Sequence, residues 1–207
     1  MTEGITVRVG TARDAAAAAR LHATTITEGF LPKLGVAFLT RLYARIVRDP
    51  RSFLLVVDGA DGLAGMIAGT EDVGALYRAF ARRDGWRAAI VAAPRLVRHA
   101  PSVVETWRYG GGGHGGSRDE ADLPPAELVA VSVAPRARGQ GVGRALVRAL
   151  DDEFDQRGVG AVKVTVGADN EEATRLYRNA GYRDAAAVEV HRGVRSLVLV
   201  RKAASAL

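Results

Sequence analysis

The sequence predicts an α/β fold in which helices flank a mixed, mainly antiparallel sheet of about seven strands. Three observations support this prediction. Segments with strand alternation and segments with helical periodicity follow one another along the 207 residues. Two pairs of strand-like segments are joined by short turns, at 58–62 and 191–193, as in antiparallel hairpins. A glycine-rich loop joins one apolar strand to a helix.

The elements can be justified in chain order from their residues. Thr11 is a candidate N-cap for an alanine-rich helix, and Asp49-Pro50 ends an amphipathic second helix. A length of 207 residues suits a single domain, and we expect residues 1–207 to form one. The predicted strands are 5–9, 53–57, 63–69, 128–133, 161–166, 186–190 and 194–200, and the first two helices are 12–24 and about 34–48.

The glycine-rich loop follows the strand at 128–133. It reads Arg138-Gly139-Gln140-Gly141-Val142-Gly143-Arg144. Glycines let the backbone turn sharply and approach a ligand closely, so successive N–H groups at the helix start can point at one anion. The two arginines add full positive charges. The sequence therefore predicts a phosphate-binding loop.

The spacing of this loop excludes two common phosphate motifs. A Walker loop needs Gly-Lys followed by Ser or Thr, and the dinucleotide fingerprint needs Gly-x-Gly-x-x-Gly with an acidic residue about 20 positions on. In this chain the third glycine is one residue early, Arg144 follows it, and the first acid past the next strand is Asp169. About 40 residues then remain, too few for a doubly wound sheet.

The loop and a later segment together resemble the GNAT superfamily of acyl-coenzyme A-dependent N-acyltransferases. The family's pyrophosphate loop reads Arg or Gln, two residues, Gly, one residue, then Gly or Ala, and residues 138–143 fit this pattern. Residues 164–182 are similar to its second motif: a strand, Asn170, a short helix carrying Tyr177, then Gly-Tyr. The resemblance covers about residues 127–200 and implies a GNAT-like sheet. The first half agrees only in the order of its strands and helices.

The resemblance implies acetyl-CoA as the acyl-donor cosubstrate. The strand at 131–133 should splay from the strand at 161–166, leaving backbone groups free for the pantetheine arm. Asn170 should hydrogen-bond that arm, cap its helix, or do both. The candidate cofactor-binding residues are Val131, Val133, Arg138, Gly139, Gln140, Gly141, Val142, Gly143, Arg144 and Asn170.

Two catalytic residues are implied. An amine with a pKa of about 10.4 is mostly protonated at pH 7, so a base is useful. Glu127 resembles the position of a catalytic glutamate in some family members, although a solvent-facing strand end is an equal alternative. Tyr177 resembles the family's general acid, which protonates the departing sulfur, although its ring could simply pack in the core. Weaker alternatives are Glu28 and Glu71 for the base, and Tyr109 and Tyr182 for the acid.

Relative to a minimal family member, residues 71–120 form an insertion. Helical patterns at 74–83, 86–98 and 101–108 are broken by glycine or proline, and a glycine run at 110–116 suggests a flexible linker or a mobile flap. The segment from 78 to 108 carries seven arginines against two acids. It is a helical excursion with a solvated basic face, a lid that shapes the acceptor pocket, a dimer contact or a membrane-surface helix.

Composition excludes several other chemistries. Without cysteine, the chain has no disulfide, no thiolate metal site and no cysteine-linked acyl-enzyme, so transfer should be direct. The histidines show no metal-ligand spacing, and we expect no metal site and surface positions for all four. Ser132 lacks a histidine partner and is not expected to be a nucleophile. The histidines are residues 22, 99, 114 and 191.

Charge and hydropathy suggest where the protein acts. The net charge is +6, and almost all of the basic residues are arginines. We attribute this excess of arginine to compositional bias rather than to nucleic-acid binding. The first residues lack a secretory pattern, and no apolar run reaches the ~18 residues of a membrane span. We expect a cytoplasmic protein without an integral membrane segment. A homodimer is plausible because the inserted helices are apolar.

The sequence thus predicts an N-acetyltransferase that acts directly on a primary amine of a small molecule, such as an amino sugar or amino-acid derivative. Two alternatives remain: acetylation of a protein N-terminus or lysine, and a non-catalytic acyl-CoA sensor. Retention of Glu127, Asn170 and Tyr177 beside the loop favours catalysis, because a sensor would need only the loop.

Overall fold

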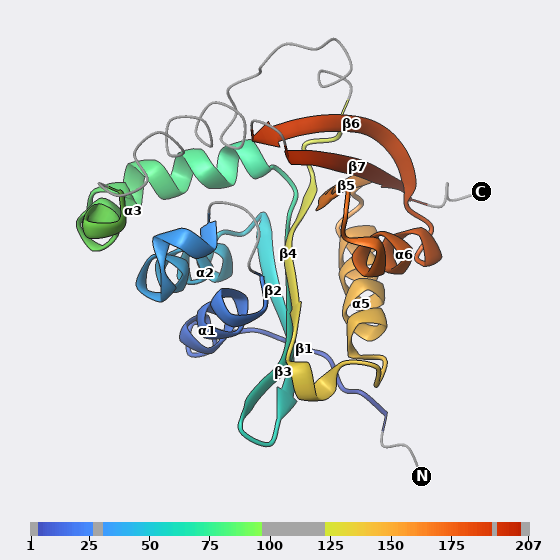
Figure 1. The fold of residues 1–207 in the computed structure, drawn as a ribbon, viewed down its shortest axis with the longest axis horizontal. Coiled ribbons are helices and arrows are strands. Elements are labelled where there is room, and N and C mark those ends of the chain that lie inside the picture. The colour runs from blue at the N-terminus through green and yellow to red at the C-terminus, as the bar shows by residue number, and fades with distance from the viewer. Residues whose placement is uncertain (1–3, 27–30, 97–122, 192–193, 204–207) are drawn as a thin grey trace.

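The structure is a computed structural model that describes residues 4–26, 31–96, 123–191 and 194–203 (Figure 1). Within these ranges, seven strands form one sheet in the order β1-β2-β3-β4-β5-β7-β6. Only the β4–β5 pair is parallel, which confirms the mixed, mainly antiparallel sheet. The strands are β1 (Arg8–Val9), β2 (Ser52–Gly59), β3 (Gly62–Thr70), β4 (Glu127–Val133), β5 (Ala161–Gly167), β6 (Arg183–His191) and β7 (Val194–Lys202).

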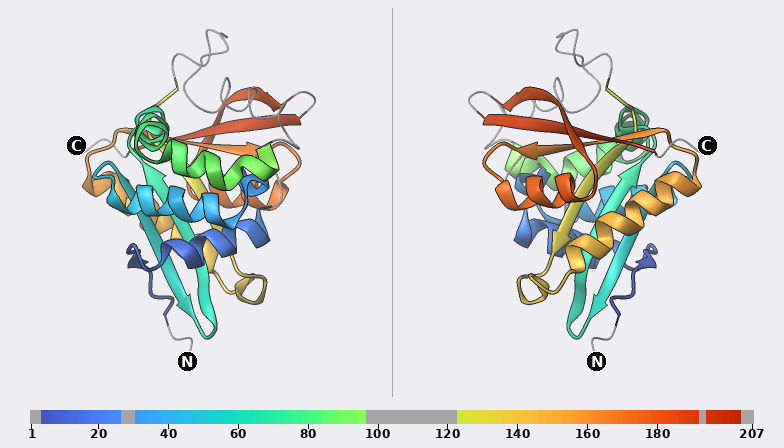
Figure 2. Two further views of the ribbon diagram at one scale, coloured as in Figure 1. Left: turned by 90° about the vertical axis from the view of Figure 1, so that its left-hand side faces the viewer. Right: turned by 90° about the vertical axis from the view of Figure 1, so that its right-hand side faces the viewer.

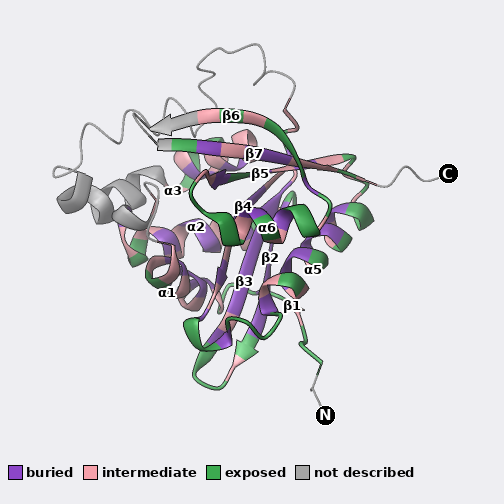
Figure 3. Ribbon diagram, turned by 45° about the vertical axis from the view of Figure 1, so that its right-hand side comes forward, coloured by how far each residue is buried: buried purple, intermediate pink, exposed green. Residues whose placement is uncertain are grey.

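Helices cover both faces of the sheet. In Figures 1 and 2, α1 and α2 lie on one face with α3 beside them, and α5 and α6 lie on the other. Buried residues line the strands and the inner sides of these helices (Figure 3). The helices are α1 (Ala15–Thr25), α2 (Val36–Arg48), α3 (Val73–Leu96), α5 (Val142–Gln156) and α6 (Glu171–Asn179), with 3₁₀ turns η1 (Leu31–Leu34) and η3 (Pro135–Ala137).

Each face has its own hydrophobic core. Leu39, Leu42 and Tyr43 of α2 pack on one side of the sheet, and Leu146 and Phe154 of α5 pack on the other. The amphipathic pattern predicted for the second helix is therefore its packing surface. No helix in the described ranges is long and apolar enough to cross a membrane.

The N-terminal elements begin later than predicted. The first strand is only Arg8–Val9, and Thr11 is not the helix cap. Asp14 holds that position, and its carboxylate accepts hydrogen bonds from the N–H and hydroxyl of Thr11 at 2.7 and 2.9 Å. Arg8 also pairs with Asp14 at 2.9 Å. Residues 11–14 therefore form a turn, and α1 starts only at Ala15.

The second helix also begins later than about Leu34. Leu34 ends the 3₁₀ turn η1, and Gly35 follows with φ 87° before α2 starts at Val36.

The inserted segment forms a longer helix than predicted. Gly85 and Pro94 were expected to break it, but both lie within α3. An interior glycine costs only about 1 kcal/mol against alanine. Pro94 cannot donate a hydrogen bond to the carbonyl four residues before it, but only two residues of α3 follow it, so it affects only the end of the helix. Figures 1 and 2 show α3 changing direction along its length. The predicted helix at 101–108 and the glycine run at 110–116 lie outside the described residues.

Candidate functional site: the β4–α5 loop and the open β4 edge

The glycine loop after β4 forms the start of α5. Gly139 and Gly141 have φ values of 73° and 87°, in the left-handed region that favours glycine, and Gly141 is the N-cap of α5. Gly143 has no positive φ, so the turn itself requires glycine only at positions 139 and 141, and a close approach of a ligand at Gly143 stays a prediction. A Cβ there would meet Leu176 at an ordinary 3.5 Å.

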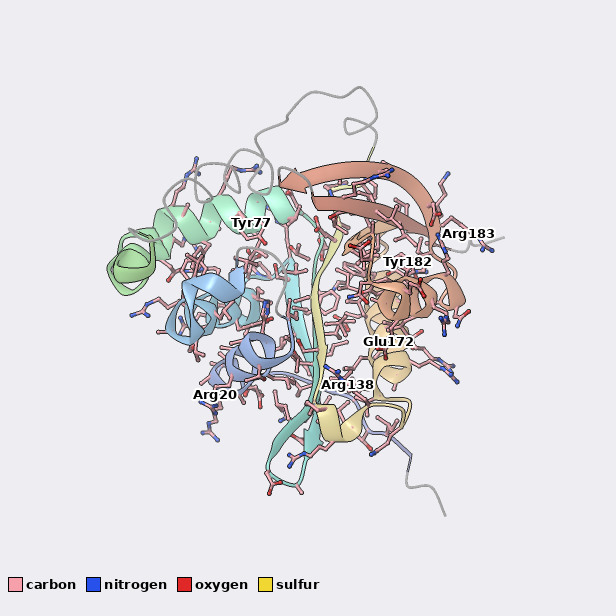
Figure 4. The ribbon with its side chains drawn as sticks, in the orientation of Figure 1. Arg20, Tyr77, Arg138, Glu172, Tyr182 and Arg183 are labelled. Atoms are coloured by element: carbon pink, nitrogen blue, oxygen red, sulfur yellow. The ribbon has the colours of Figure 1, made fainter. Side chains whose placement is uncertain are left out.

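The loop offers donors to an anion. Within the described residues, the backbone N–H groups of residues 139–144 donate no hydrogen bond. Residues 142–144 form the first turn of α5, where a helix has no intrahelical acceptors. No acidic residue occupies this turn, and Arg138 and Arg144 are exposed without a carboxylate partner in the part of the chain described. Figure 4 shows Arg138 between the end of β4 and α5. Gln140 braces the loop because its Nε2 donates to the Arg136 carbonyl at 2.8 Å.

A close approach between α5 and the sheet fixes this helix end. Val142 is buried in the core, so only its backbone can face a ligand. Gly65 of β3 makes room for it: a Cβ at Gly65 would lie 2.7 Å from Val142 Cγ1 and 2.8 Å from Leu146 Cδ1. This glycine was not among the residues predicted from the sequence. Its position inside a strand pattern was the available signal, since such glycines mark close backbone approach.

The β4 strand leaves one edge unpaired beside the loop. β4 and β5 pair only at Glu127 and Lys163, so the predicted splay of these strands is confirmed. On its other edge β4 pairs with β3, and the Ala134 N–H donates to Ala64 at 2.8 Å. Because successive residues bond to opposite sides, the N–H and C=O groups of Val131 and Val133 face the unpaired edge.

Tyr177 lies in the core beneath α6. Tyr177 is a residue of α6 and is only 3% exposed. Burial raises the pKa of its phenol, so the phenol stays protonated at neutral pH. Its hydroxyl has no hydrogen-bond partner among the described residues. Tyr182, at 5.8 Å between ring centroids, differs because its hydroxyl donates to Asp151 at 2.8 Å. Asn170 caps α6: its Oδ1 accepts the Ala173 N–H at 3.1 Å.

Glu127 lies at the point where β4 and β5 meet. Its side chain is 19% exposed, so the alternative of a solvent-facing strand end is wrong. Burial raises its pKa, and the Lys163 ammonium, 3.7 Å from Oε2, acts against this rise. Lys163 also donates to the Pro124 carbonyl at 2.8 Å. Burial and the nearby charge of Glu127 raise the pKa of Tyr77, a residue of α3 labelled in Figure 4.

These positions form two groups. Glu127, Lys163 and Tyr77 lie together on the α3 side of the sheet, and Tyr177 and Tyr182 lie together on the α6 side. The open β4 edge lies between the two sides, and no contact joins Glu127 to Tyr177 within the described residues. Lys163 and Tyr77 were not predicted as site residues, because their approach to Glu127 depends on strand register and helix packing.

Other sequence candidates have structural partners or lie elsewhere. Glu71 pairs with Arg157 at 3.1 Å. The expectation that every histidine is at the surface is wrong for His22, which is 3% exposed, with Nδ1 2.7 Å from the Tyr43 hydroxyl. α1 is alanine-rich and packs closely on α2, which buries this ring. Glu28, Tyr109, His99 and His114 lie outside the described residues.

The residues around the loop fit acetyl-CoA. Backbone N–H groups and two exposed arginines suit its phosphates. A Cβ at Gly139 would meet nothing within 4 Å, so the loop is open at this position. The open groups of Val131 and Val133 suit the amides of a pantetheine arm. The Ser132 hydroxyl on the same strand is buried without a partner in the described part of the chain. Within that part, no cluster of His, Cys, Asp and Glu could hold a metal ion.

Comparison with known proteins places this arrangement in a family. A model of the acetyltransferase (GNAT) family matches residues 20–182. This match spans more than half of the chain, so the chain belongs to the GNAT acetyltransferase family.

Two named relatives match a shorter part of the chain. A ribosomal protein bS18-alanine N-acetyltransferase from Escherichia coli is 40% identical over 63 residues, 30% of this chain and 43% of that protein. A mycothiol acetyltransferase from Kocuria rhizophila is 41% identical over 69 residues, 33% of this chain and 22% of that protein. The chain thus matches less than half the length of either relative.

A solved structure extends the comparison to the fold. Arabidopsis thaliana NAA60, in complex with acetyl-CoA, gives a TM-score of 0.59 at 13% identity and covers 97% of this chain and 99% of that one. At this identity the likeness concerns the fold alone.

Proposed function

We propose that this protein is an acetyl-CoA-dependent N-acetyltransferase that transfers an acetyl group directly to a primary amine of a small molecule, such as an amino sugar or amino-acid derivative. The observation that carries the proposal is the combination of unbonded N–H groups at the start of α5 with the unpaired β4 edge next to them. Membership of the GNAT family and the resemblance to a mycothiol acetyltransferase support it.

The loop and the open strand edge would hold the donor. Arg138, Arg144 and the N–H groups of residues 139–144 bind the phosphates. Val131 and Val133 pair with the pantetheine arm, and Asn170, whose Oδ1 already caps α6, has its Nδ2 group left for the same arm. Acetyl-CoA supplies an activated thioester carbonyl to this site.

Glu127 would act as the base. It accepts a proton from the acceptor nitrogen, directly or through water, as that nitrogen bonds to the carbonyl carbon. A carboxylate is a stronger base when its pKa is raised, and burial raises the pKa of Glu127. The nearby Lys163 ammonium limits that rise and favours the ionised form that catalysis needs.

Tyr177 would act as the acid as the carbon–sulfur bond breaks. Its phenol is protonated at neutral pH and has no partner among the described residues, so its proton is available to the departing sulfur. Tyr182 is a weaker candidate because Asp151 already accepts its hydrogen bond at 2.8 Å. The chain contains no cysteine, which supports direct transfer without a cysteine-linked intermediate.

A second acceptor class is the N-terminal amine of a protein. The Escherichia coli relative is named for an alanine of a ribosomal protein, which favours this candidate. The loop at 25–33, the 71–120 segment and the final hairpin would line the acceptor side of the site, and parts of all three lie outside the described residues.

Thiol release from acetyl-CoA against a panel of amino sugars, amino-acid derivatives and alanine-starting peptides tests the proposal. We expect turnover with a small amine. Turnover restricted to peptides would move the function to the second acceptor class. Tight coenzyme A binding without turnover on any acceptor would favour the sensor, and failure to bind coenzyme A would refute the proposal.

A further inference from the structure

A second basic region lies far from the glycine loop. A pocket of about 380 Å³ opens between the end of α2, the turn that joins α2 to β2, and the first part of α3. The start of β2 pairs with the end of β3 at Ser52 and Thr70, whereas β4 leads into the loop from the opposite end of β3, at Gly65. The pocket and the loop therefore lie at opposite ends of the sheet. Six arginines line the pocket: Arg45, Arg48, Arg51, Arg78, Arg82 and Arg83.

The acidic residues of the pocket are already engaged. The Asp49 carboxylate accepts a hydrogen bond from the Arg51 N–H at 3.0 Å, and the Asp72 carboxylate accepts one from the Ala75 N–H at 2.7 Å. Both carboxylates therefore bind backbone N–H groups of the local chain. Of the six arginines, Arg45 has a close carboxylate partner, Asp84, at 2.6 Å.

The remaining guanidinium groups have little local compensation. Arg78 lies 3.9 Å from Asp72, and Arg48, Arg51, Arg82 and Arg83 form no ion pair within the described residues. A solvated basic face of α3 would put arginines on one helix only. Here they converge on one cavity from α2, the α2–β2 turn and α3. Like charges repel there unless an anion lies between them.

The lining indicates the class of anion. It contains no aromatic ring and no large aliphatic side chain, and its apolar members are Pro50, Ala75 and Ala79. Bases of a nucleic acid would find no ring to stack on, and an apolar ligand would find little surface. Guanidinium forks match phosphate oxygens, and the volume suits a small ligand rather than a polymer.

We propose that this pocket between α2 and α3 binds a small, multiply phosphorylated anion, held by guanidinium groups from both helices. The site is separate from the acetyl-CoA loop and does not depend on the proposed function. Six arginines against Asp49, Asp72 and the Asp84 that pairs with Arg45 leave a formal charge of +3, which a compact polyphosphate can neutralise.

Calorimetric titration with tripolyphosphate at about 0.15 M salt, which screens distant charges, tests the proposal. Arg48→Gln/Arg82→Gln removes one exposed arginine from each wall. Two control variants remove the same two positive charges elsewhere. Arg138→Gln/Arg144→Gln removes them from the glycine loop, and Arg13→Gln/Arg20→Gln removes them from exposed positions in and just before α1. Figure 4 shows Arg20 on α1, and neither Arg13 nor Arg20 lines the pocket.

We expect saturable binding to the wild type that weakens by about ten-fold or more in the pocket variant, since each lost charge-assisted hydrogen bond is substantial. The α1 and loop variants should keep this binding event within about two-fold. Arg48→Lys/Arg82→Lys should give an intermediate loss, because lysine keeps the charge without the fork. Unchanged melting temperatures would show that the variants fold.

The absence of saturable tripolyphosphate binding to the wild type would overturn the proposal, and so would loss of binding only in the loop variant. Equal weakening of binding in all three glutamine variants would indicate unspecific charge attraction and would also overturn it. Much tighter binding of a glutamate-rich peptide or an oligonucleotide through the same arginines would assign the pocket to another ligand class.

Discussion

Two regions of this molecule present positive charge to solvent in different ways. The loop before α5 uses backbone N–H groups, two glycines with positive φ and two arginines, all within seven consecutive residues. The pocket between α2 and α3 uses guanidinium groups from the two helices and from the turn that follows α2. A backbone site is specified by local sequence, whereas a side-chain site is assembled only when distant elements pack together.

The same contrast applies to the two sides of the sheet. The α5–α6 side carries the proposed acid and the donor site, and both follow motifs that are contiguous in sequence. The α1–α3 side carries Tyr77 and the pocket, which the sequence did not single out, and the buried His22, which was expected at the surface. The predictions below test how separate the two sides are.

The largest expected effect is on the α6 side. Tyr177→Phe should lower turnover by about 100-fold or more, because the departing sulfur loses its proton donor. Stability should change little, since the hydroxyl has no described partner to lose. Tyr182→Phe is the control: it loses the Asp151 hydrogen bond, at a cost of about 1 kcal/mol in stability, and should keep turnover. Steady-state kinetics and melting curves measure both, and full turnover by Tyr177→Phe would remove this assignment.

The second effect separates the loop from the pocket. Gly141→Val should weaken acetyl-CoA binding by about ten-fold or more, because a β-branched residue disfavours the φ of 87°. Gly158→Val is the matched control: Gly158 has φ 71° at the other end of α5, so the protein should lose stability without losing affinity. Arg48→Gln/Arg82→Gln should also leave acetyl-CoA affinity unchanged. Equal affinities for all three variants, measured by calorimetry, would count against the loop as the donor site.

The third effect concerns the α3 side. Glu127→Gln should lower kcat/KM for the acceptor by about ten-fold at neutral pH and remove the acidic limb of its pH profile. In the wild type that limb should lie above the ordinary glutamate range, since burial raises the pKa of Glu127. Lys163→Met should move the limb to still higher pH because it removes an opposing ammonium. An unchanged profile in both variants would show that Glu127 is not the base.

The smallest expected effect is on the pH dependence of stability, through one buried titratable group on each side of the sheet. Burial lowers the pKa of His22 to about 4, so its contribution to stability is full above about pH 6.5 and is lost as pH falls toward 4. Burial raises the pKa of Asp151 to about 6, so its contribution is full below about pH 3.8 and is lost as pH rises toward 6. In the wild type the two contributions oppose each other over this range.

Single variants should separate these contributions. As pH falls from 6.5 to 4, the free energy of unfolding of His22→Gln should rise relative to that of the wild type. That of Asp151→Asn should fall relative to the wild type over the same range. Each change should reach up to about 3 kcal/mol. Urea unfolding at several pH values measures the difference, with exposed Asp152→Asn as the control. Parallel pH curves for wild type and both variants would contradict these pKa shifts.

The sequence predicted the second half of the chain better than the first for a physical reason. The strand, glycine loop, helix and Asn170 cap are local signals, read within a few residues, and the structure has each of these elements. The breaks expected at Gly85 and Pro94 were wrong because local propensity is weak beside the hydrogen bonding of a long helix. His22 was misplaced because burial depends on what packs against α1.

By itself, the sequence determined the order of strands and helices, the loop that caps α5 and the family to which the chain belongs. These depend on backbone conformations that glycines, caps and periodicity encode locally. Only the tertiary structure decided that Gly65 admits α5 to the sheet, that Lys163 lies against Glu127, and that arginines of α2 and α3 share one pocket. Such contacts join residues far apart in the chain, and strand register and helix packing alone bring them together.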